Sequence, residues 1–371
     1  MLSSGITIQF NPVSGRKVLR YESLGVLKIV PEKVSSGYTL VPTFRGRVVR
    51  LIDIDGTEVH KWDLPGRLGS LAYLLPNGNL LCSTVTDDGP PVRQAKGGHL
   101  YELDWSGGVV WDYVDHSQHH DLRRLPNGNT IYLGWRAMTD TAAARVRGGI
   151  AGMEKEGKIY EDYVREVSPK GETVWEWAVS ELEIERYPLS DGVTRFEFAH
   201  ANTCLPLPNG QILLNFRNLD LMAILNKETR EFIWEKRNIM WGRPHDPHLL
   251  ENGDILFFAN GSQDIIAPAR SNIIQFNKET GKETWRYEAP MAWTFYSHVM
   301  GGVERLSNGN TLIVESVSGR IFEVTPDCEL VWDYINPDFD AIFPSSKEPG
   351  NAVFRALRYA PDSPELAGRL E

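Results

Sequence analysis

Short runs of alternating hydrophobic and polar residues recur along the 371-residue chain. Such alternation is typical of half-buried β-strands, because successive side chains of a strand point to opposite faces of its sheet. Similar phrases that contain an Asn-Gly pair punctuate these runs at 77–78, 127–128, 209–210, 252–253 and 308–309. We expect each pair to form a type I′ hairpin turn, in which both central residues have positive φ.

A second phrase also recurs, made of an apolar strand, a polar turn and a strand that ends in tryptophan. Its six copies end at Trp62, Trp111, Trp175, Trp234, Trp285 and Trp332, at intervals of 47 to 64 residues. Four short strands per period predict one blade of a β-propeller. The fold class is therefore expected to be all-β, a six-bladed β-propeller of four-stranded blades, with a tryptophan in each outermost strand packed between blades.

The first blade lacks an innermost strand in its own part of the sequence. Residues 353–362 resemble the missing strand, so we expect the C-terminal strand to complete blade one and close the ring, which removes an open sheet edge. Residues 37–362 then form the propeller. Residues 1–36 are an N-terminal extension packed on it, and residues 363–371 are a C-terminal tail.

Two segments fall outside the repeat. Residues 137–160 are inserted between the second and third strands of blade three, and residues 180–199 join blade three to blade four. Both segments are candidates to cap one face of the ring.

Histidines precede the last four Asn-Gly phrases at similar distances, as His119/His120, His200, His245/His248 and His298. Because neighbouring strand residues face opposite sides, we select His120 and His245 from their pairs: their phrases, each beginning His-Asp, align best with the repeat. The repeat then predicts that imidazoles from four consecutive blades converge at one mouth of the central channel. The predicted cluster is His120, His200, His245 and His298.

Polar residues near these histidines suggest an anionic ligand. Asn202 lies two residues after His200, on the same expected strand face, and Arg217, Arg243 and Arg270 fall near the ends of inner strands. A guanidinium group binds planar or tetrahedral anions through several donors at once.

Composition narrows the class of protein and of partner. The chain is 42% hydrophobic and 24% charged, and its net charge of −10 argues against a nucleic-acid or anionic-membrane partner. Three widely spaced cysteines do not form a disulfide framework. No signal peptide or membrane span is recognisable, so we expect a cytoplasmic protein, or a periplasmic one if a leader precedes this sequence. The expected partner is a small anionic or aromatic substrate, and the sequence leaves the oligomeric state open.

The phrases at 200–203, 212–220, 245–261 and 269–276 resemble the bacterial arylsulfate sulfotransferase family of six-bladed propellers. The resemblance implies an enzyme without a cofactor, in which a channel histidine takes the sulfuryl group from an aryl sulfate and a phenol then accepts it. By position, His200 matches the family's His-x-Asn motif, His245 its His-Asp motif and Arg270 its anion-binding arginine, with His298 as the candidate nucleophile. Substrate binding is then expected from His120, Asn202, Arg217 and Arg243.

Two alternatives remain open from the sequence. In the first, the chain is a metal-dependent lyase, hydrolase or oxygenase acting on a small anionic molecule, with a divalent transition metal held by His120, His200, His245 and His298. Asp121, Asp246, Glu197 and Glu304 would then orient the imidazoles. In the second, the propeller is a non-catalytic platform that binds proteins, and substitution of the histidines leaves its function unchanged.

Overall fold

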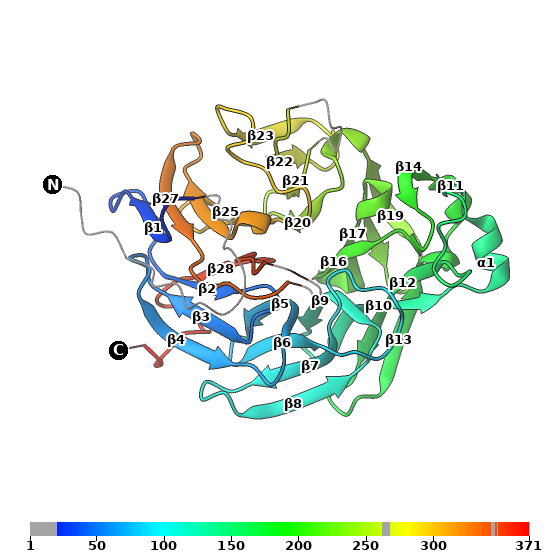
Figure 1. Ribbon diagram of the computed structural model, residues 1–371, viewed down its shortest axis with the longest axis horizontal. Helices are drawn as coiled ribbons and strands as arrows, with labels where there is room; N and C mark the ends of the chain where they lie inside the picture. The colour runs from blue at the N-terminus through cyan, green and yellow to red at the C-terminus, as the bar shows by residue number, and fades with distance from the viewer. Residues whose placement is uncertain (1–20, 262–267, 343–345, 347, 371) are drawn as a thin grey trace.

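The computed structural model describes residues 21–261, 268–342, 346 and 348–370. Six antiparallel sheets are arranged as blades around a ring, which confirms the predicted all-β six-bladed propeller (Figure 1). In that view β5, β9, β16, β20 and β28 lie towards the middle of the ring, and β4, β8 and β13 lie at its rim.

Each of the first three blades has four strands in series, named below in order from the innermost to the outermost. Blade one contains β28 (Leu357–Tyr359), β2 (Tyr38–Pro42), β3 (Val48–Ile52) and β4 (Glu58–Asp63). Blade two contains β5 (Leu68–Leu74), β6 (Leu80–Val85), β7 (Gly98–Leu103) and β8 (Val109–Val114). Blade three contains β9 (Gln118–Arg124), β10 (Thr130–Ala137), β12 (Tyr160–Val167) and β13 (Thr173–Ala178).

The other three blades follow the same order. Blade four contains β16 (Ala201–Leu207), β17 (Gln211–Phe216), β18 (Leu221–Asn226) and β19 (Phe232–Arg237). Blade five contains β20 (His245–Leu249), β21 (Asp254–Ala259), β22 (Asn272–Asn277) and β23 (Glu283–Glu288). Blade six contains β24 (Gly302–Arg305), β25 (Thr311–Glu315), β26 (Arg320–Val324) and β27 (Leu330–Ile335), and β1 (Gly25–Ile29) adds a fifth strand outside β27.

Each periodic tryptophan occupies the fourth strand of its blade, as the sequence predicts. Each indole N–H donates a hydrogen bond of 2.7–3.2 Å to a backbone carbonyl of the next blade. The last of these bonds runs from Trp332 in blade six to Ile54 in blade one, so the series passes around the whole ring. The acceptors of the other five are Asp104, Pro169, Lys227, Lys278 and Pro326.

The C-terminal segment pairs with blade one. Strand β28 is antiparallel to β2, with Tyr359 opposite Tyr38. The buried Arg358 of β28 donates from Nε to the Thr39 hydroxyl at 2.6 Å and forms an ion pair with Glu323 of blade six at 3.3 Å. This segment thus contacts both the first and the last blade. Its energetic role in closing the ring and the domain boundaries at 36/37 and 362/363 stay predictions.

The Asn-Gly turns differ from the prediction at four of five sites. The glycines have positive φ, but only Asn209 among the five asparagines does. At the other four turns the glycine N–H bonds the carbonyl of the leucine three residues before it. That geometry is a type I turn followed by a left-handed glycine, and at two sites a proline before the asparagine fixes the φ that this turn requires. The type I′ prediction was therefore wrong outside 209–210.

The two segments outside the repeat contact each other. The first carries α1 (Asp140–Arg145) and β11 (Gly148–Ile150), and β11 pairs in parallel with β14 (Leu189–Thr194) of the second. Arg145 also forms an ion pair with Glu185 at 2.7 Å. Strand β15 (Glu197–Phe198) then runs parallel to β12 and leads the chain into blade four.

Six short 3-10 helices complete the described secondary structure, and within the described residues no helix is long and apolar enough to span a membrane. The 3-10 helices are η1 (Val179–Glu181), η2 (Ile184–Arg186), η3 (Pro208–Gly210), η4 (Arg217–Leu219), η5 (Ile239–Trp241) and η6 (Ser316–Ser318).

Candidate functional site

The four selected histidines line one cavity of about 580 Å³, here called the axial cavity. His120 belongs to β9, His200 directly precedes β16, His245 opens β20 and His298 lies in the segment before β24. The histidines therefore come from the innermost parts of four consecutive blades. Arg217 and Arg243 line the same cavity.

Irregular backbone aims these histidines. The pairing of the inner strand shifts register in β9, β16 and β20, at the same end of each strand. His120 and His200 have φ of 50° and 55°, and Asp246, which follows His245, has φ of 52°. Positive φ is uncommon for residues other than glycine, and β-bulges re-aim side chains beside active sites.

The bulge explains how adjacent histidines take different roles. His119 is fully buried and stacks on Trp135 with ring centroids 3.8 Å apart. His120 instead lines the axial cavity, where its ring meets His200 edge-on at 4.8 Å between centroids. Strict strand alternation would place the two rings on opposite faces, but their Nδ1 atoms are only 2.7 Å apart.

Hydrogen bonds fix the tautomers of two cavity histidines. His200 Nδ1 lies 2.6 Å from Glu197 Oε1, so Nδ1 carries a proton and donates it to the carboxylate. His245 Nδ1 lies 2.7 Å from Asn260 Oδ1 and 3.1 Å from the Arg243 carbonyl, and both are acceptors. The Asn260 amide nitrogen donates to the carbonyls of Ser297 and Met300, which fixes its orientation. In the neutral form of either ring, Nε2 therefore has the lone pair.

The cavity favours neutral imidazoles. Burial and the nearby Arg217 charge lower the pKa of His245 to about 3. The same two causes lower the pKa of His298, which is the most exposed of the four. Burial opposes the charged form of Glu197, yet its pKa is lowered by His200, whose Nδ1–H donates to it. The carboxylate is thus ionised in the same cavity as the neutral rings of His245 and His298.

Two guanidinium groups stand in the cavity without a carboxylate partner. Burial and the like charge of Arg243 lower the pKa of Arg217 to about 10, which still leaves it protonated. Arg217 Nη1 donates to the Asn218 side chain at 3.1 Å, and within the described part of the chain neither guanidinium forms an ion pair. The charges of Glu197 and Asp220 act on Arg217, but neither carboxylate forms an ion pair with it, so both guanidinium groups keep N–H donors for an anion.

The rest of the wall is mainly apolar. Phe196 and Val193 come from the second inserted segment, Met300 and Val299 from the approach to blade six, and Phe44 from blade one. The cavity therefore joins a cationic end to an apolar surface. Apart from Glu197, the inserted segment was not expected to contribute residues to the site, and the repeat pattern contains no signal for it.

A buried ionic network fills the centre of the ring next to the histidines. Arg355 forms ion pairs with Asp246 at 2.9 Å and with Asp121 at 3.3 Å, and donates to the Thr203 hydroxyl at 2.9 Å. It thus connects the innermost strands of blades three, four and five. Arg355 lies outside the Asn-Gly repeat, so the repeat pattern gives no signal for it.

The acidic residues proposed to orient the imidazoles have mostly other contacts. Asp121 and Asp246 also accept backbone N–H groups of Cys204 and Val303. Glu304 accepts the Arg358 backbone N–H at 2.8 Å. Glu197 is the one among these four that bonds a cavity histidine directly.

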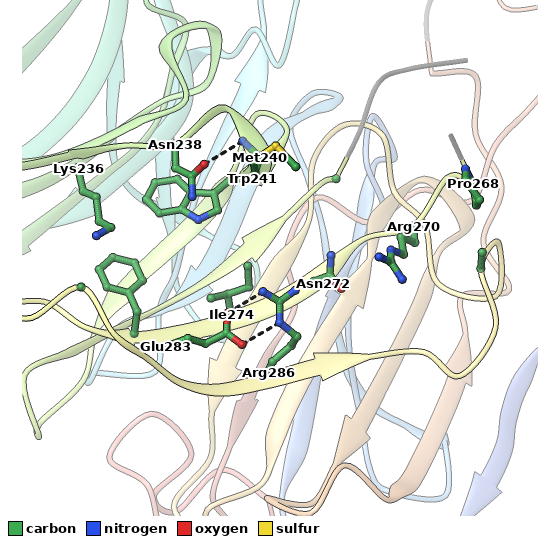
Figure 2. A pocket seen from close by; sticks show the side chains of 14 residues that line it. Lys236, Asn238, Met240, Trp241, Pro268, Arg270, Asn272, Ile274, Glu283 and Arg286 are labelled. Carbon is green, nitrogen blue, oxygen red and sulfur yellow. Dashed lines mark hydrogen bonds and ion pairs between the residues drawn. The ribbon is translucent and has the colours of Figure 1, made fainter. Parts of the chain in front are cut away.

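Two predicted site residues lie outside the axial cavity. Arg270 lines a separate groove between blades four and five, shown in Figure 2, and forms an ion pair with Glu288 at 2.6 Å. Its guanidinium is 56% exposed and faces a carboxylate on the neighbouring strand. Asn202 is fully buried at the bulge of β16 and donates to the Pro244 carbonyl at 2.9 Å. Asn202 thus ties blade four to the segment that enters blade five.

The side chains of the cavity bear on the metal-dependent alternative. Among the residues that the structure describes, no three His, Cys, Asp or Glu side chains form a group arranged to hold a metal ion. The Nδ1 atoms of His200 and His245 are engaged by Glu197 and Asn260, and His120 Nδ1 by His119.

Fold and site together define a six-bladed propeller whose axis carries a histidine and arginine cavity. Residues 96–337 match the family model described as arylsulfotransferase (ASST). The chain belongs to this arylsulfotransferase family, as the resemblance of its fourth and fifth blades suggests.

One solved structure shares the fold at low sequence identity, and another is similar with a lower score. A protein of unknown function from Bacteroides caccae is similar with a TM-score of 0.53 at 14% identity, over 87% of this chain and 99% of that chain. A catalytically inactive virginiamycin B lyase from Staphylococcus aureus, solved with quinupristin, gives 0.47 at 9% identity, over 87% and 90% of the two chains. The search of curated proteins gave no match.

Proposed function

We propose that this protein transfers a sulfuryl group from an aryl sulfate to a phenolic acceptor through a histidine of the axial cavity. The observation that carries the proposal is that two guanidinium groups, which form no ion pair with any described residue, share one cavity with the neutral imidazoles of His245 and His298. Membership of the arylsulfotransferase family supports the same chemistry.

The cavity suits both parts of an aryl sulfate. The sulfate ester carries a negative charge that Arg217 and Arg243 can bind through several N–H donors. The aromatic ring can pack on the apolar wall that includes Phe196 and Val193. A phenolic acceptor has the same ring without the anion, so it fits the wall after the first product leaves.

His298 is the proposed nucleophile. Its lowered pKa keeps the imidazole neutral near pH 7, and its exposure makes it reachable from the mouth. In the first step a histidine nitrogen bonds to sulfur as the sulfur–oxygen bond to the aryl group breaks. In the second, the acceptor oxygen bonds to sulfur as the nitrogen–sulfur bond breaks. Arg217 and Arg243 stabilise the charge on the sulfuryl oxygens throughout.

The remaining histidines have supporting roles in this proposal. Glu197 accepts a hydrogen bond from His200 Nδ1–H, so in the neutral ring Nε2 has the lone pair and is placed to accept the proton of the incoming phenol. His245 and His120 complete the polar side of the cavity and bind the sulfuryl oxygens or the leaving oxygen. Arg270, which lies outside the cavity, has no role in this scheme.

The test is to incubate the protein with 4-nitrophenyl sulfate alone, and then with a phenol. Wild type should release one equivalent of nitrophenol in a burst, gain the mass of one sulfuryl group, and lose that mass when phenol is added. His298→Ala should lose burst and adduct. His116→Ala, at a half-buried histidine that does not line the cavity, is the matched control and should behave as wild type.

Two results would contradict the proposal. No transfer by wild type from a panel of aryl sulfates would reject the reaction, and an intact burst in His298→Ala would assign the nucleophile to another histidine. Elemental analysis of protein purified without chelators addresses the metal-dependent alternative. A stoichiometric transition metal would indicate that the four histidines are its ligands, and it would favour the metal-dependent alternative over sulfuryl transfer.

A further inference from the structure

A chain of buried ionisable side chains leads away from the axial cavity behind His120. His119 Nδ1 lies 2.7 Å from His120 Nδ1, and His119 Nε2 lies 3.3 Å from Oδ1 of Asp162 in strand β12. Asp162 and His119 are 1% and 0% exposed, whereas His120 lines the cavity. The three residues therefore connect the cavity to a carboxyl group with no direct access to water.

Packing alone does not account for this carboxyl group. Both Asp162 oxygens and His119 Nε2 lack a well-oriented hydrogen bond among the described residues. A buried polar group in that state costs free energy, roughly 1–3 kcal/mol, and native structures contain few of them. Trp135 stacks on the His119 ring and holds its plane, so the approach to Asp162 is maintained by packing.

The surroundings decide which atoms carry protons. Burial raises the pKa of Asp162 to about 8, because the opposing effect of His200 is smaller and the neighbouring Glu197 and Glu161 also disfavour its charge. Asp162 is thus a neutral acid near pH 7. Burial and the positive charges possible on nearby histidines keep the pKa of His119 and His120 well below the usual value, so both rings are neutral.

A neutral imidazole has one donor and one acceptor nitrogen, so the protons along this chain must alternate. Asp162 Oδ1 lies 3.3 Å from His119 Nε2, so a neutral Asp162 can donate to that nitrogen once the carboxyl group turns into line with it. His119 then donates from Nδ1 to His120 Nδ1, and His120 keeps its proton on Nε2. Every group in the chain is uncharged, and the exposed end of the chain is an N–H donor.

We propose that Asp162 and His119 form a proton relay that acts through His120 on the phenol leaving the donor. The inference rests on the proposed sulfuryl transfer. As the sulfur–oxygen bond breaks, the leaving oxygen takes the proton from His120 Nε2. His120 Nδ1 takes the proton from His119 Nδ1, and His119 Nε2 takes the proton from Asp162. The phenol leaves neutral, and the balancing negative charge is on Asp162.

The second half-reaction resets the relay. The acceptor phenol gives its proton to His120 Nε2 as its oxygen bonds to sulfur, directly or after His200 has taken it. The two imidazoles pass a proton back, and Asp162 is protonated again. Protons and charges therefore balance over one full cycle without an external acid. His120 touches the substrate, and His119 and Asp162 are positioning residues that act through it.

The test compares Asp162→Asn with wild type on two donors. Phenyl sulfate has a strongly basic leaving group that needs a proton, and 4-nitrophenyl sulfate has a weakly basic one. Asparagine still donates to His119 Nε2 but cannot release the proton. The turnover of phenyl sulfate should fall about 100-fold, while that of 4-nitrophenyl sulfate should fall less than about threefold.

Glu166→Gln is the matched control, because Glu166 is a buried carboxylate of the same strand that bonds Asn129 and Lys227 away from the cavity. It should keep the wild-type ratio of the two rates. A wild-type ratio in Asp162→Asn would overturn the relay, and no transfer by wild type would reject the proposed function together with the relay.

A second measurement needs no variant. The rate of phenyl sulfate turnover by wild type is followed in mixtures of light and heavy water. Several protons moving together give a curved dependence on the deuterium fraction, which the relay predicts. A linear dependence means that one proton moves, and it would overturn the relay even if Asp162→Asn failed to fold.

Discussion

Arg217 and Arg243 illustrate how single residues define the site. The two guanidinium groups lie near each other, and the charge of Arg243 lowers the pKa of Arg217. Arg217 in turn lowers the pKa of the nearby histidines. Neither guanidinium has a carboxylate ion-pair partner among the described residues. Arg270 shows the opposite case, because Glu288 already neutralises it on the surface. The difference between these arginines is their surroundings, not their residue type.

The first prediction uses that difference. Arg217→Gln should raise the KM for an anionic aryl sulfate at least about tenfold, because one charge-assisted pair worth about 1.5–3 kcal/mol is lost. Arg270→Gln is the control and should change KM by less than about twofold. Steady-state kinetics on both variants decide. An effect confined to Arg270 would return the anion site to the groove of Figure 2.

The second prediction concerns pH. The pKa values of His245, about 3, and of His298 are lowered, so both rings stay neutral as the pH falls through the ordinary histidine range near 6.5. A sulfate ester keeps its charge over the same range. Any acid limb in the pH profile of kcat/KM should therefore have its midpoint below the ordinary histidine value of about 6.5. A midpoint at 6.5 or higher would mean that the nucleophile is an ordinary exposed histidine.

At the scale of elements, the site depends on segments that leave the regular repeat. The bulges of β9, β16 and β20 aim the histidines, and the segment before β16 supplies both Glu197 and part of the apolar wall. The C-terminal segment supplies Arg355 to the centre of the ring and pairs β28 with β2.

The third prediction is that the C-terminal segment stabilises the closed ring. Deleting 350–371 leaves β2 with an open edge and removes Arg355 and Arg358, which form ion pairs with the buried Asp121, Asp246 and Glu323, and the loss of a partner from a buried ion pair is costly. We expect the melting temperature to fall by about 10 °C or more, with loss of activity. Truncation after residue 362 keeps β28 and Arg355 and should cost much less. Equal stability of both truncated proteins would show that β28 does not close the ring.

At the scale of the whole molecule, equivalent indole–carbonyl bonds connect each blade to the next. A closed ring has no end blades, so the junction between blades six and one should contribute like the others. An open array, in contrast, has terminal repeats that lack one neighbour.

The fourth prediction tests this equivalence. Trp332→Phe, at the junction of blades six and one, and Trp234→Phe, at that of blades four and five, each remove one indole donor but keep an aromatic ring. Each should lower the free energy of unfolding by about 1 kcal/mol without changing activity. Denaturant unfolding measures both. A loss several times larger at one junction than at the other would contradict the predicted equivalence of the junctions.

Features of this protein that depend on local interactions could be predicted from its sequence, and features that depend on contacts between distant residues could not. The number of blades and the position of each tryptophan repeat locally, so they were predicted correctly. The type I′ turn predicted for the Asn-Gly pairs was wrong at four of the five sites. There the asparagine has negative φ and only the glycine is left-handed, which gives a type I turn with a bulge. The equivalent repeat positions also grouped His120, His200, His245 and His298, which line one cavity in the structure, and their role as a site stays a prediction.

The sequence by itself therefore determined the architecture and the residues that converge, since both are encoded in a period of short strands. Only the tertiary structure decided their chemistry. The contacts with Glu197, Asn260 and His119 orient the ring nitrogens of the cavity histidines. Arg355 comes from the far end of the chain to the centre of the ring. Arg270 forms an ion pair with Glu288 outside the axial cavity. These contacts depend on bulges and on meetings between different blades, which no local pattern of hydrophobic and polar residues contains.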